Sequence, residues 1–250
     1  MLADHTPLSA RAQLAAVAEA AASGRGRGGL KALRNLPTAA ASRPAAVLML
    51  FGVLDGLPSD HEAQAEAVSR DLDVLLLSRA STLRSHPGQV AFPGGRMDPG
   101  DDGPIDAALR EAQEETGLDP AGVEVLGALE NIPLAYSAHV VTPVLAWWRH
   151  PSPVHVVDEA ESADVFRAPV ADLLDPANRG VTVIRRDGQE WRGPGFLVRR
   201  FGSLSDSSGV HLVWGFTGML LDGLFDRLGW TEPWDATREL PLVLPAMESR

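Results

Sequence analysis

The chain has 250 residues and no cysteine, and its 33 acidic against 22 basic side chains give a formal charge of −11. The absence of cysteine excludes a disulfide framework, a thiolate zinc site and a cysteine nucleophile. The acidic balance argues against a general nucleic-acid binder, which presents a basic surface. A chain of this length buries roughly 70 to 75% of the surface that its unfolded form exposes, so we expect one domain with additional segments at its ends.

The N-terminal part predicts one amphipathic helix over Leu8–Ala22. This stretch is rich in alanine but carries Arg11 and Glu19, which argues against a signal peptide and against a membrane span. The following run GRGRGG lacks the preceding strand and the lysine–serine ending of a phosphate-binding loop, so we interpret it as a flexible linker. We therefore expect a cytoplasmic protein that does not bind membranes, with a helix and a linker over residues 1–45.

Apolar runs bounded by turn residues predict strands along most of the remaining chain. The polar segment 58–70 is compatible with a helical insertion, and helices are expected at 104–116, at 216–228 and, as a short one, after Pro169. The expected strands are 46–51, 74–77, 89–92, 123–129, 140–148, 181–185, 196–200 and 210–214. This order predicts a mixed α/β domain, followed by a proline-punctuated tail that wraps the surface or frays.

The segment 92–118, FPGGRMDPGDDGPIDAALREAQEETGL, joins a glycine turn to a helix that carries a cluster of charges. If residues 104–116 are helical, Glu111 and Glu115 stand one turn apart on one face and repel each other. Arg110 can pair with Glu114, four residues on, but Glu111 has no basic neighbour at helical spacing. A hard cation such as Mg²⁺ or Mn²⁺ is therefore the missing partner of these carboxylates.

The residues on either side of this helix support the same interpretation. Gly94 and Gly95 leave the backbone bare, where a pyrophosphate and its metal ions could approach closely. Asp101 or Asp102 can cap the start of the helix, and Gly117 stands where a helix stop belongs. The segment thus predicts a site that holds a divalent metal against phosphate.

The order of these residues resembles the Nudix box, whose pattern is glycine, five residues, Glu, seven residues and then REUxEExGU with U aliphatic. An aspartate replaces the first glutamate, and one extra residue stands between Asp101 and Arg110, which leaves the roles of Asp98, Asp101 and Asp102 open. The matching residues are Gly95, Arg110, Glu111, Ala112, Glu114, Glu115, Gly117 and Leu118.

The stretch Leu75–Gly95, LLLSRASTLRSHPGQVAFPGG, is similar to the motif of the coenzyme A pyrophosphatase subfamily, with Leu77 in place of a threonine. Arg79 and Arg84 lie in this motif, and arginine can grip a phosphate through two hydrogen bonds. The alternative for each is a surface arginine or a structural pair with a nearby acid. Beyond the motif the resemblance continues faintly over residues 165–174 and 213–220.

The resemblance implies a Nudix-type α/β/α sandwich, with a mixed β-sheet between helices, over residues 46–230 and a C-terminal tail over 231–250. It also implies hydrolysis of the pyrophosphate bond of coenzyme A, or of its acyl or oxidised derivatives, to 3′,5′-ADP and 4′-phosphopantetheine or its derivative. The expected cofactor is Mg²⁺ or Mn²⁺. The expected partner is this small molecule and no nucleic acid, and a homodimer is left open.

The roles that the resemblance implies fall on three groups of residues. Glu111 and Glu115 would bind the metal together with the carbonyl of Gly95, and Glu114 would be either another ligand or the base that takes a proton from water. Arg110 would orient the glutamates. The substrate would contact Arg79, Arg84, Gly94 and Gly95.

Two other functions stay open at this point. The nearer alternative is a Nudix hydrolase that acts on another nucleoside diphosphate derivative, such as ADP-ribose or NADH. The more distant alternative is a non-catalytic binding module with the same fold. The intact set Arg110, Glu111, Glu114 and Glu115 argues against that module, because a pure binder does not need a cluster of repelling carboxylates.

Overall fold

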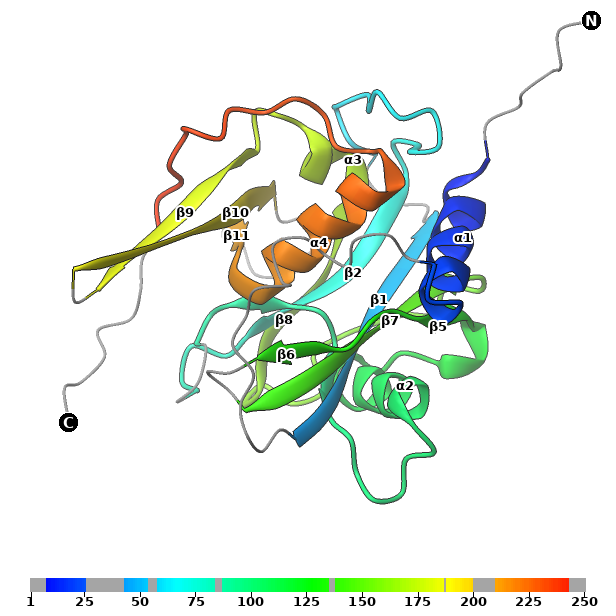
Figure 1. Ribbon diagram of the computed structural model, residues 1–250. Coiled ribbons are helices and arrows are strands. Elements are labelled where there is room, and N and C mark those ends of the chain that lie inside the picture. Colours follow the sequence, from blue (N-terminus) through cyan, green and yellow to red (C-terminus); the bar gives the residue numbers. More distant parts are fainter. Residues whose placement is uncertain are drawn as a thin grey trace, which may run out of the picture.

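The structure is a computed structural model that describes residues 8–25, 43–53, 58–83, 87–134, 138–186, 188–199 and 210–242. Its centre is a mixed sheet of eight strands whose main path has the order β3-β2-β1-β7-β5 (Figure 1). The strands are β1 (Arg43–Val53), β2 (Leu72–Arg79), β3 (Val90–Ala91), β4 (Gly94–Arg96), β5 (Val123–Ala128), β6 (Ile132–Leu134), β7 (His139–Trp148) and β8 (Ser162–Pro169).

Strand β1 lies in the middle of this sheet and pairs with three others. It runs parallel to β7 and antiparallel to β2 and β4, while β8 pairs with β2 on the far side. The apolar run of β1 is buried over most of its length, as expected for a strand covered on both faces. Position 94 of β4 pairs with Val47, so the glycine turn lies directly against the central strand.

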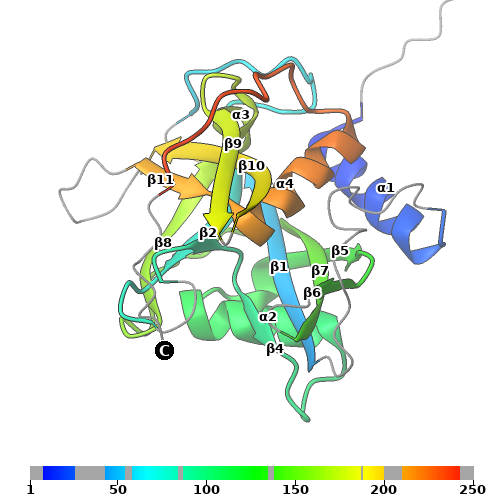
Figure 2. The same cartoon turned by 60° about the vertical axis from the view of Figure 1, so that its left-hand side comes forward.

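The two faces of the sheet carry separate hydrophobic cores. One core contains the small side chains of helix α2 (Pro104–Thr116), and the other contains apolar residues of α1 (Ala10–Ala22) and α4 (Gly215–Leu228). The turned view shows α2 below the sheet and α4 above it (Figure 2). The expected α/β/α sandwich with a mixed sheet between helices is therefore confirmed.

A second, three-stranded sheet joins the α4 side of the molecule. It has the order β11-β10-β9, and residues of the C-terminal segment pair with its edge: the Val181 amide donates to the Arg238 carbonyl at 2.8 Å. In Figure 1 the red C-terminal segment leaves the end of the orange helix and runs along the outer edge of this sheet, beside β9. These elements are β9 (Arg179–Arg186), β10 (Gln189–Arg199) and β11 (Val210–Val213), with the short helices α3 (Val170–Leu174) and η2 (Pro120–Gly122) elsewhere.

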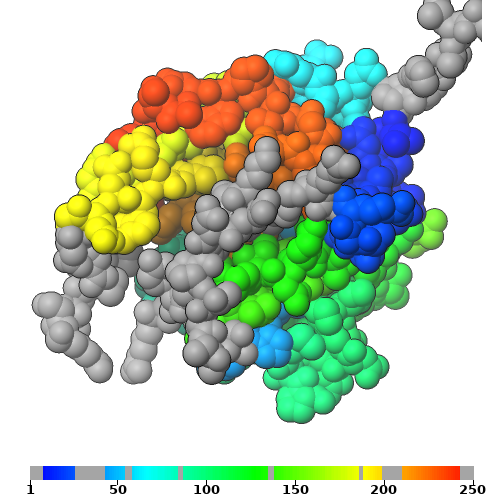
Figure 3. Space-filling view, in the orientation of Figure 1, coloured from blue at the N-terminus to red at the C-terminus, as the bar shows by residue number. Residues whose placement is uncertain are grey.

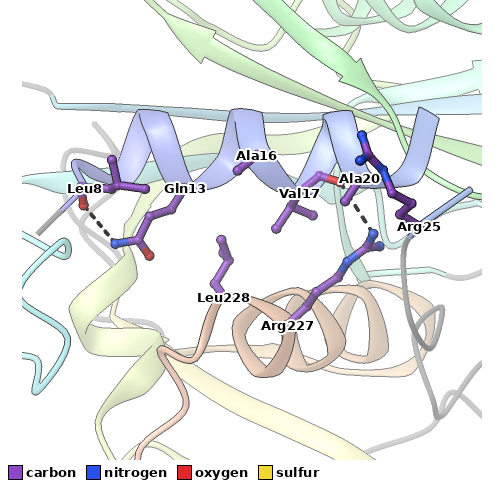
Figure 4. A pocket seen from close by; sticks show the side chains of 8 residues that line it. All are labelled: Leu8, Gln13, Ala16, Val17, Ala20, Arg25, Arg227 and Leu228. Atoms are coloured by element: carbon purple, nitrogen blue, oxygen red, sulfur yellow. Dashed lines mark hydrogen bonds between the residues drawn. The ribbon is translucent and has the colours of Figure 1, made fainter. Parts of the chain in front are cut away.

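Helix α1 packs onto the hydrophobic core that also contains the apolar residues of α4. Leu14 is fully buried, and Gln13 accepts a hydrogen bond of 2.8 Å from the indole nitrogen of Trp230. Arg11 forms an ion pair with Glu124 on β5. Figure 3 shows the blue helix lying against α4 on the surface, and Figure 4 shows the shallow hollow between them, where Arg227 reaches the carbonyl of Val17.

Some expected elements differ from the structure. The helical insertion at 58–70 is wrong: its described residues form bends and turns, and Ser59 donates to the Asp172 carboxylate instead of to a helical partner. Strand β10 begins at Gln189 and not at 196, because β9 supplies a complete antiparallel partner across Gly193 and Pro194. The short strands β4 and β6 were not expected. None of the described helices is both long enough and apolar enough to cross a membrane.

Burial of Asp73 on β2 predicts a stability that depends on pH. Asp73 is 6% exposed, and burial raises its pKa to about 7, although Arg167 acts in the opposite direction. An unfolded aspartate has a pKa of about 3.9. Between about pH 4 and pH 7 the folded protein keeps a proton that the unfolded chain loses, so stability falls as pH rises through this window and levels off above it.

Asp73→Asn removes this pH-dependent cost. We expect the variant to raise the free energy of unfolding by about 2 to 4 kcal/mol more at pH 8 than at pH 4, on the scale of 1.4 kcal/mol per pKa unit. Urea unfolding at the two pH values measures the difference. Asp60→Asn is the control, because the side chain of Asp60 is 97% exposed. The same change in stability at both pH values would contradict the prediction.

Candidate functional site

Helix α2 is built to lie close to the sheet. Proline occupies its first turn, and the side chains of Ala107, Ala108 and Ala112 are fully buried against the central strands. The helix ends at Gly117, which has a φ of 68° in the left-handed region that glycine adopts without strain. The predicted bounds and the predicted glycine stop are both confirmed.

The cap of this helix differs from the sequence prediction. Gly103 is the capping residue and provides no side-chain hydrogen bond, so a cap by Asp101 or Asp102 is wrong. Asp101 instead accepts hydrogen bonds from the Asp98 amide at 2.7 Å and from Nε of Arg110 at 2.9 Å. A guanidinium that offers two parallel hydrogen bonds is a stronger partner for a carboxylate than the free amides of a helix end.

Arg110 connects the loop before the helix to two glutamates on it. Its Nη1 lies 2.9 Å from Glu114, which confirms the predicted pair, and its Nη2 lies 3.1 Å from Glu111 and 3.0 Å from the carbonyl of Arg96. Glu111 still has no basic residue at helical spacing, but Arg110 is a basic partner that this spacing does not reveal. Residues three and four positions apart are neighbours on a helix surface, but the long side chain of Arg110 also reaches the carboxylate of Glu111, the next residue in the sequence.

Glu111 lies against the bare backbone of the glycine turn. A Cβ atom added at Gly95 would stand 2.4 Å from Cδ of Glu111 and 2.5 Å from each of its oxygens. Burial raises the pKa of this carboxyl, and the hydrogen bond from Arg110 only partly opposes the effect. Glu111 is thus a half-buried acid with an incomplete supply of positive charge.

Glu115 occupies the neighbouring position. Its Oε2 accepts a hydrogen bond of 2.9 Å from the Gly94 amide. The pKa of Glu115 is raised to about 7, chiefly by burial and also by the charge of Glu111, while the hydrogen bond from the Gly94 amide acts in the opposite direction. Gly94 itself cannot carry a side chain here, because a Cβ would lie 2.3 Å from the carbonyl oxygen of Ala46.

Glu111 and Glu115 fit a divalent cation by their charge and chemistry. Both are carboxylates that burial makes harder to ionise, and a nearby cation favours the ionised form of each. The side chain of Glu114 is 59% exposed and paired with Arg110. Among the residues that the structure describes, no three acidic or histidine side chains are grouped closely enough to hold a metal by themselves.

Arg79 lies at the end of β2 and faces the same region. Its Nε is buried and has no hydrogen-bond partner within the described part of the chain. The positive charge of Arg79 is also one of the causes that lower the pKa of Glu115, after burial has raised it. Arg84, the other predicted substrate residue, falls outside the described residues.

Comparisons with known proteins agree with this geometry. A family model described as the NUDIX domain matches residues 63–186, a range that contains β2, the glycine turn and α2. The uncharacterized Nudix hydrolase NudL of Photorhabdus laumondii is 36% identical over 156 residues, which cover 62% of this chain and 76% of that protein. Nudix hydrolase 3 of Caenorhabditis elegans is 34% identical over 155 residues, which cover 59% of this chain and 63% of that protein.

Solved structures show a weaker likeness. The NUDIX domain of Shewanella oneidensis NrtR, in complex with ADP ribose, has a TM-score of 0.39 and 21% identity, and the match covers 61% of this chain and 85% of that one.

Gly95→Ala tests the close approach between the glycine turn and Glu111. The new methyl would overlap the carboxylate, so we expect Glu111 to move and the hydrolytic rate to fall by about tenfold or more, the scale of losing one electrostatic contact. The melting temperature should change little, because the clash is with the end of a flexible side chain. Gly100→Ala is the control, since a Cβ at Gly100 has open space around it. Full activity of Gly95→Ala would contradict the assigned geometry.

Proposed function

This chain belongs to the Nudix hydrolase family, and on that premise we propose that it hydrolyses the pyrophosphate bond of a nucleoside diphosphate derivative with the help of a divalent cation. The observation that carries the proposal is the pair Glu111 and Glu115, both half-buried, both short of positive charge and both lying against the bare backbone of the glycine turn. Phosphate-bound Mg²⁺ or Mn²⁺ is the cation that such carboxylates suit.

Glu111 and Glu115 would hold the cation, with the Gly95 carbonyl as a further ligand. The bound cation would neutralise phosphate charge and lower the pKa of a bound water. Arg110 would orient the glutamates, because its guanidinium joins Asp101 in the loop to Glu111 on the helix. The Gly94 amide would orient Glu115 through its hydrogen bond to the carboxylate. Because Gly94 and Gly95 have no side chains, they would leave room for the substrate.

Within this reaction we propose coenzyme A, or an acyl or oxidised derivative of it, as the substrate. Support comes from the motif over residues 75–95 and from Arg79, a partly buried arginine near Glu115 whose Nε has no hydrogen-bond partner among the described residues. A guanidinium in that state has hydrogen bonds to offer to a phosphate. The products would be 3′,5′-ADP and 4′-phosphopantetheine or its derivative.

A substrate panel tests the proposal directly. Incubation with coenzyme A, ADP-ribose and NADH, each with Mg²⁺ or Mn²⁺, followed by mass analysis of the products, distinguishes the substrates. A preference for ADP-ribose would overturn coenzyme A as the substrate and leave the metal site intact. Hydrolysis of none of the three would count against the hydrolase function.

The metal site has its own test in Glu115→Gln. We expect activity to vanish with a chelator, to return with Mg²⁺ or Mn²⁺, and to fall at least about a hundredfold in the variant at saturating metal. Wild-type protein should also melt at a higher temperature with Mg²⁺ than without it, because the cation binds only the folded state. Glu62→Gln, which removes an exposed carboxylate from another part of the chain, should keep full activity. Full activity of Glu115→Gln would remove Glu115 from the metal site.

Substrate recognition is tested by Arg79→Ala. If Arg79 holds the 3′-phosphate, kcat/KM for coenzyme A should fall by a factor that corresponds to about 1.5 to 3 kcal/mol of transition-state stabilisation, the scale of a hydrogen bond to a charged group. The kcat/KM for dephospho-coenzyme A should fall much less. Equal losses on the two substrates would place Arg79 on the bridging pyrophosphate. No loss on either would return it to a structural role. Arg149→Ala, at an exposed arginine, is the matched control.

A further inference from the structure

Residues 59–70 form a closed loop over the larger hydrophobic core. The Ser59 amide donates to the Arg70 carbonyl at 3.0 Å, and the Arg70 guanidinium donates to the Ser59 carbonyl in return. A compact loop whose two ends meet in this way is an Ω-loop, a type that often has a role of its own. Figure 2 shows the cyan loop at the top of the molecule, next to α3 and the red C-terminal segment.

The inner side of this loop is buried. Val68 is 6% exposed, and the alanines at positions 63, 65 and 67 pack against the core, while the residues at 62, 64 and 66 are exposed. The hydroxyl of Ser59 donates to the carboxylate of Asp172 on α3, and both side chains are buried. Apolar contacts and a carboxylate from another element thus hold the loop at its base.

Glu232, in the segment after α4, is a second buried acid that contacts the loop. It is 3% exposed, and its Oε1 lies 2.9 Å from Nε2 of His61 and accepts a hydrogen bond of 3.0 Å from the Gln64 amide. Within the described part of the chain, His61 is the ion-pair partner of Glu232. A buried carboxylate is costly unless a positive charge or hydrogen bonds compensate it. The loop contributes both kinds of compensation to Glu232.

This compensation depends on pH because part of it comes from a histidine. Histidine gains and loses its positive charge between about pH 5 and pH 8, a range in which a carboxylate with a positive partner is ionised. At the acidic end His61 and Glu232 form an ion pair. At the alkaline end the imidazole is neutral, and the attraction that fastens the loop is lost. The other charged side chains of the loop are exposed to solvent, which screens them: Asp60, Glu62, Glu66 and Arg70.

Asp73 on β2 responds to pH in the same direction at the base of the loop. Burial is the main cause that raises its pKa to about 7, Arg167 opposes it, and the charges of Asp71 and Asp172 add to it. Above that pH the ionised Asp73 repels Asp172, the partner of Ser59. Because Asp73 lies in the central sheet, its ionisation bears on the whole fold and has to be separated from that of the His61 pair.

We propose that His61 and Glu232 form a pH-sensitive latch, which is closed when the imidazole carries its second proton and released when the imidazole loses it. Release lets the loop over residues 59–70 open at alkaline pH while the central sheet stays folded. Opening exposes the inner side of the loop, with Val68 and Ser59, to solvent. The inference depends neither on the proposed hydrolase function nor on coenzyme A as the substrate.

Hydrogen exchange of the Gln64 amide tests the latch, because this amide donates to Glu232 itself. The measurement is made on the full chain with Asp73→Asn, which removes the ionisation in the central sheet. After correction for the intrinsic exchange rate, we expect the protection of this amide to fall at least about fivefold from pH 6 to pH 8, the scale of a half-buried ion pair. The amide of Leu50, fully buried in β1, reports opening of the whole molecule and should keep its protection.

Two variants remove the switch by different routes. His61→Gln replaces the titrating ring with an amide that stays neutral, and Glu232→Gln removes the buried charge, so in each the protection of the Gln64 amide should no longer depend on pH. The matched control is His150→Gln, at an exposed histidine, which should keep the full pH dependence. An unchanged pH dependence in both variants would overturn the latch. Equal losses of protection at Gln64 and Leu50 would also overturn it, because the molecule would then open as a whole.

Discussion

Burial of two neighbouring carboxylates, Glu111 and Glu115, is the constraint on which the rest of the site depends. Burial makes each of them harder to ionise, and the charge of Glu111 adds to that cost at Glu115. The protein offsets the cost only in part, with Arg110 beside Glu111 and the Gly94 amide on Glu115. A divalent cation would offset the rest of the free-energy cost of ionising these two carboxylates, as the proposed function requires.

The same constraint explains why this part of the chain is made of small residues. The glutamates can meet the glycine turn only if α2 lies close to β1 and β4, and the alanine face of the helix allows that approach. The turn in turn has no room for side chains, since a Cβ at Gly94 would meet the backbone of Ala46 and one at Gly95 would meet Glu111. Packing and chemistry therefore impose a single requirement on these positions.

The sheet brings a further charge to this helix. Arg79 ends the strand that is antiparallel to β1, and its charge lowers the pKa of Glu115. Hydrogen bonds from the β7–β8 loop to the end of α2 place that loop next to Glu115. The opposite face of the sheet is covered by α1, α4 and the second sheet, which bury the larger hydrophobic core.

Much of the architecture could be predicted from local pattern, because local physics decides it. The bounds of α2 and its glycine stop follow from a proline, a periodic alanine face and a residue that adopts positive φ. The Arg110–Glu114 pair follows from helical spacing. Elements that depend on distant partners were not predictable in this way: segment 58–70 is polar enough for a helix, but its Ser59 bonds to Asp172, and β10 extends through Gly193 and Pro194 because β9 pairs with it.

The sequence by itself determined the parts of the site: the glycine turn, the helix that follows it, and the order of the arginine and glutamates on that helix. Only the tertiary structure decided how those charges are shared. Asp101 became the partner of Arg110 and not a helix cap, because folding of the loop brought its carboxylate to the guanidinium. The attachment of the β7–β8 loop to the end of α2 carries no local signal at all, since it arises from hydrogen bonds between segments far apart in the chain.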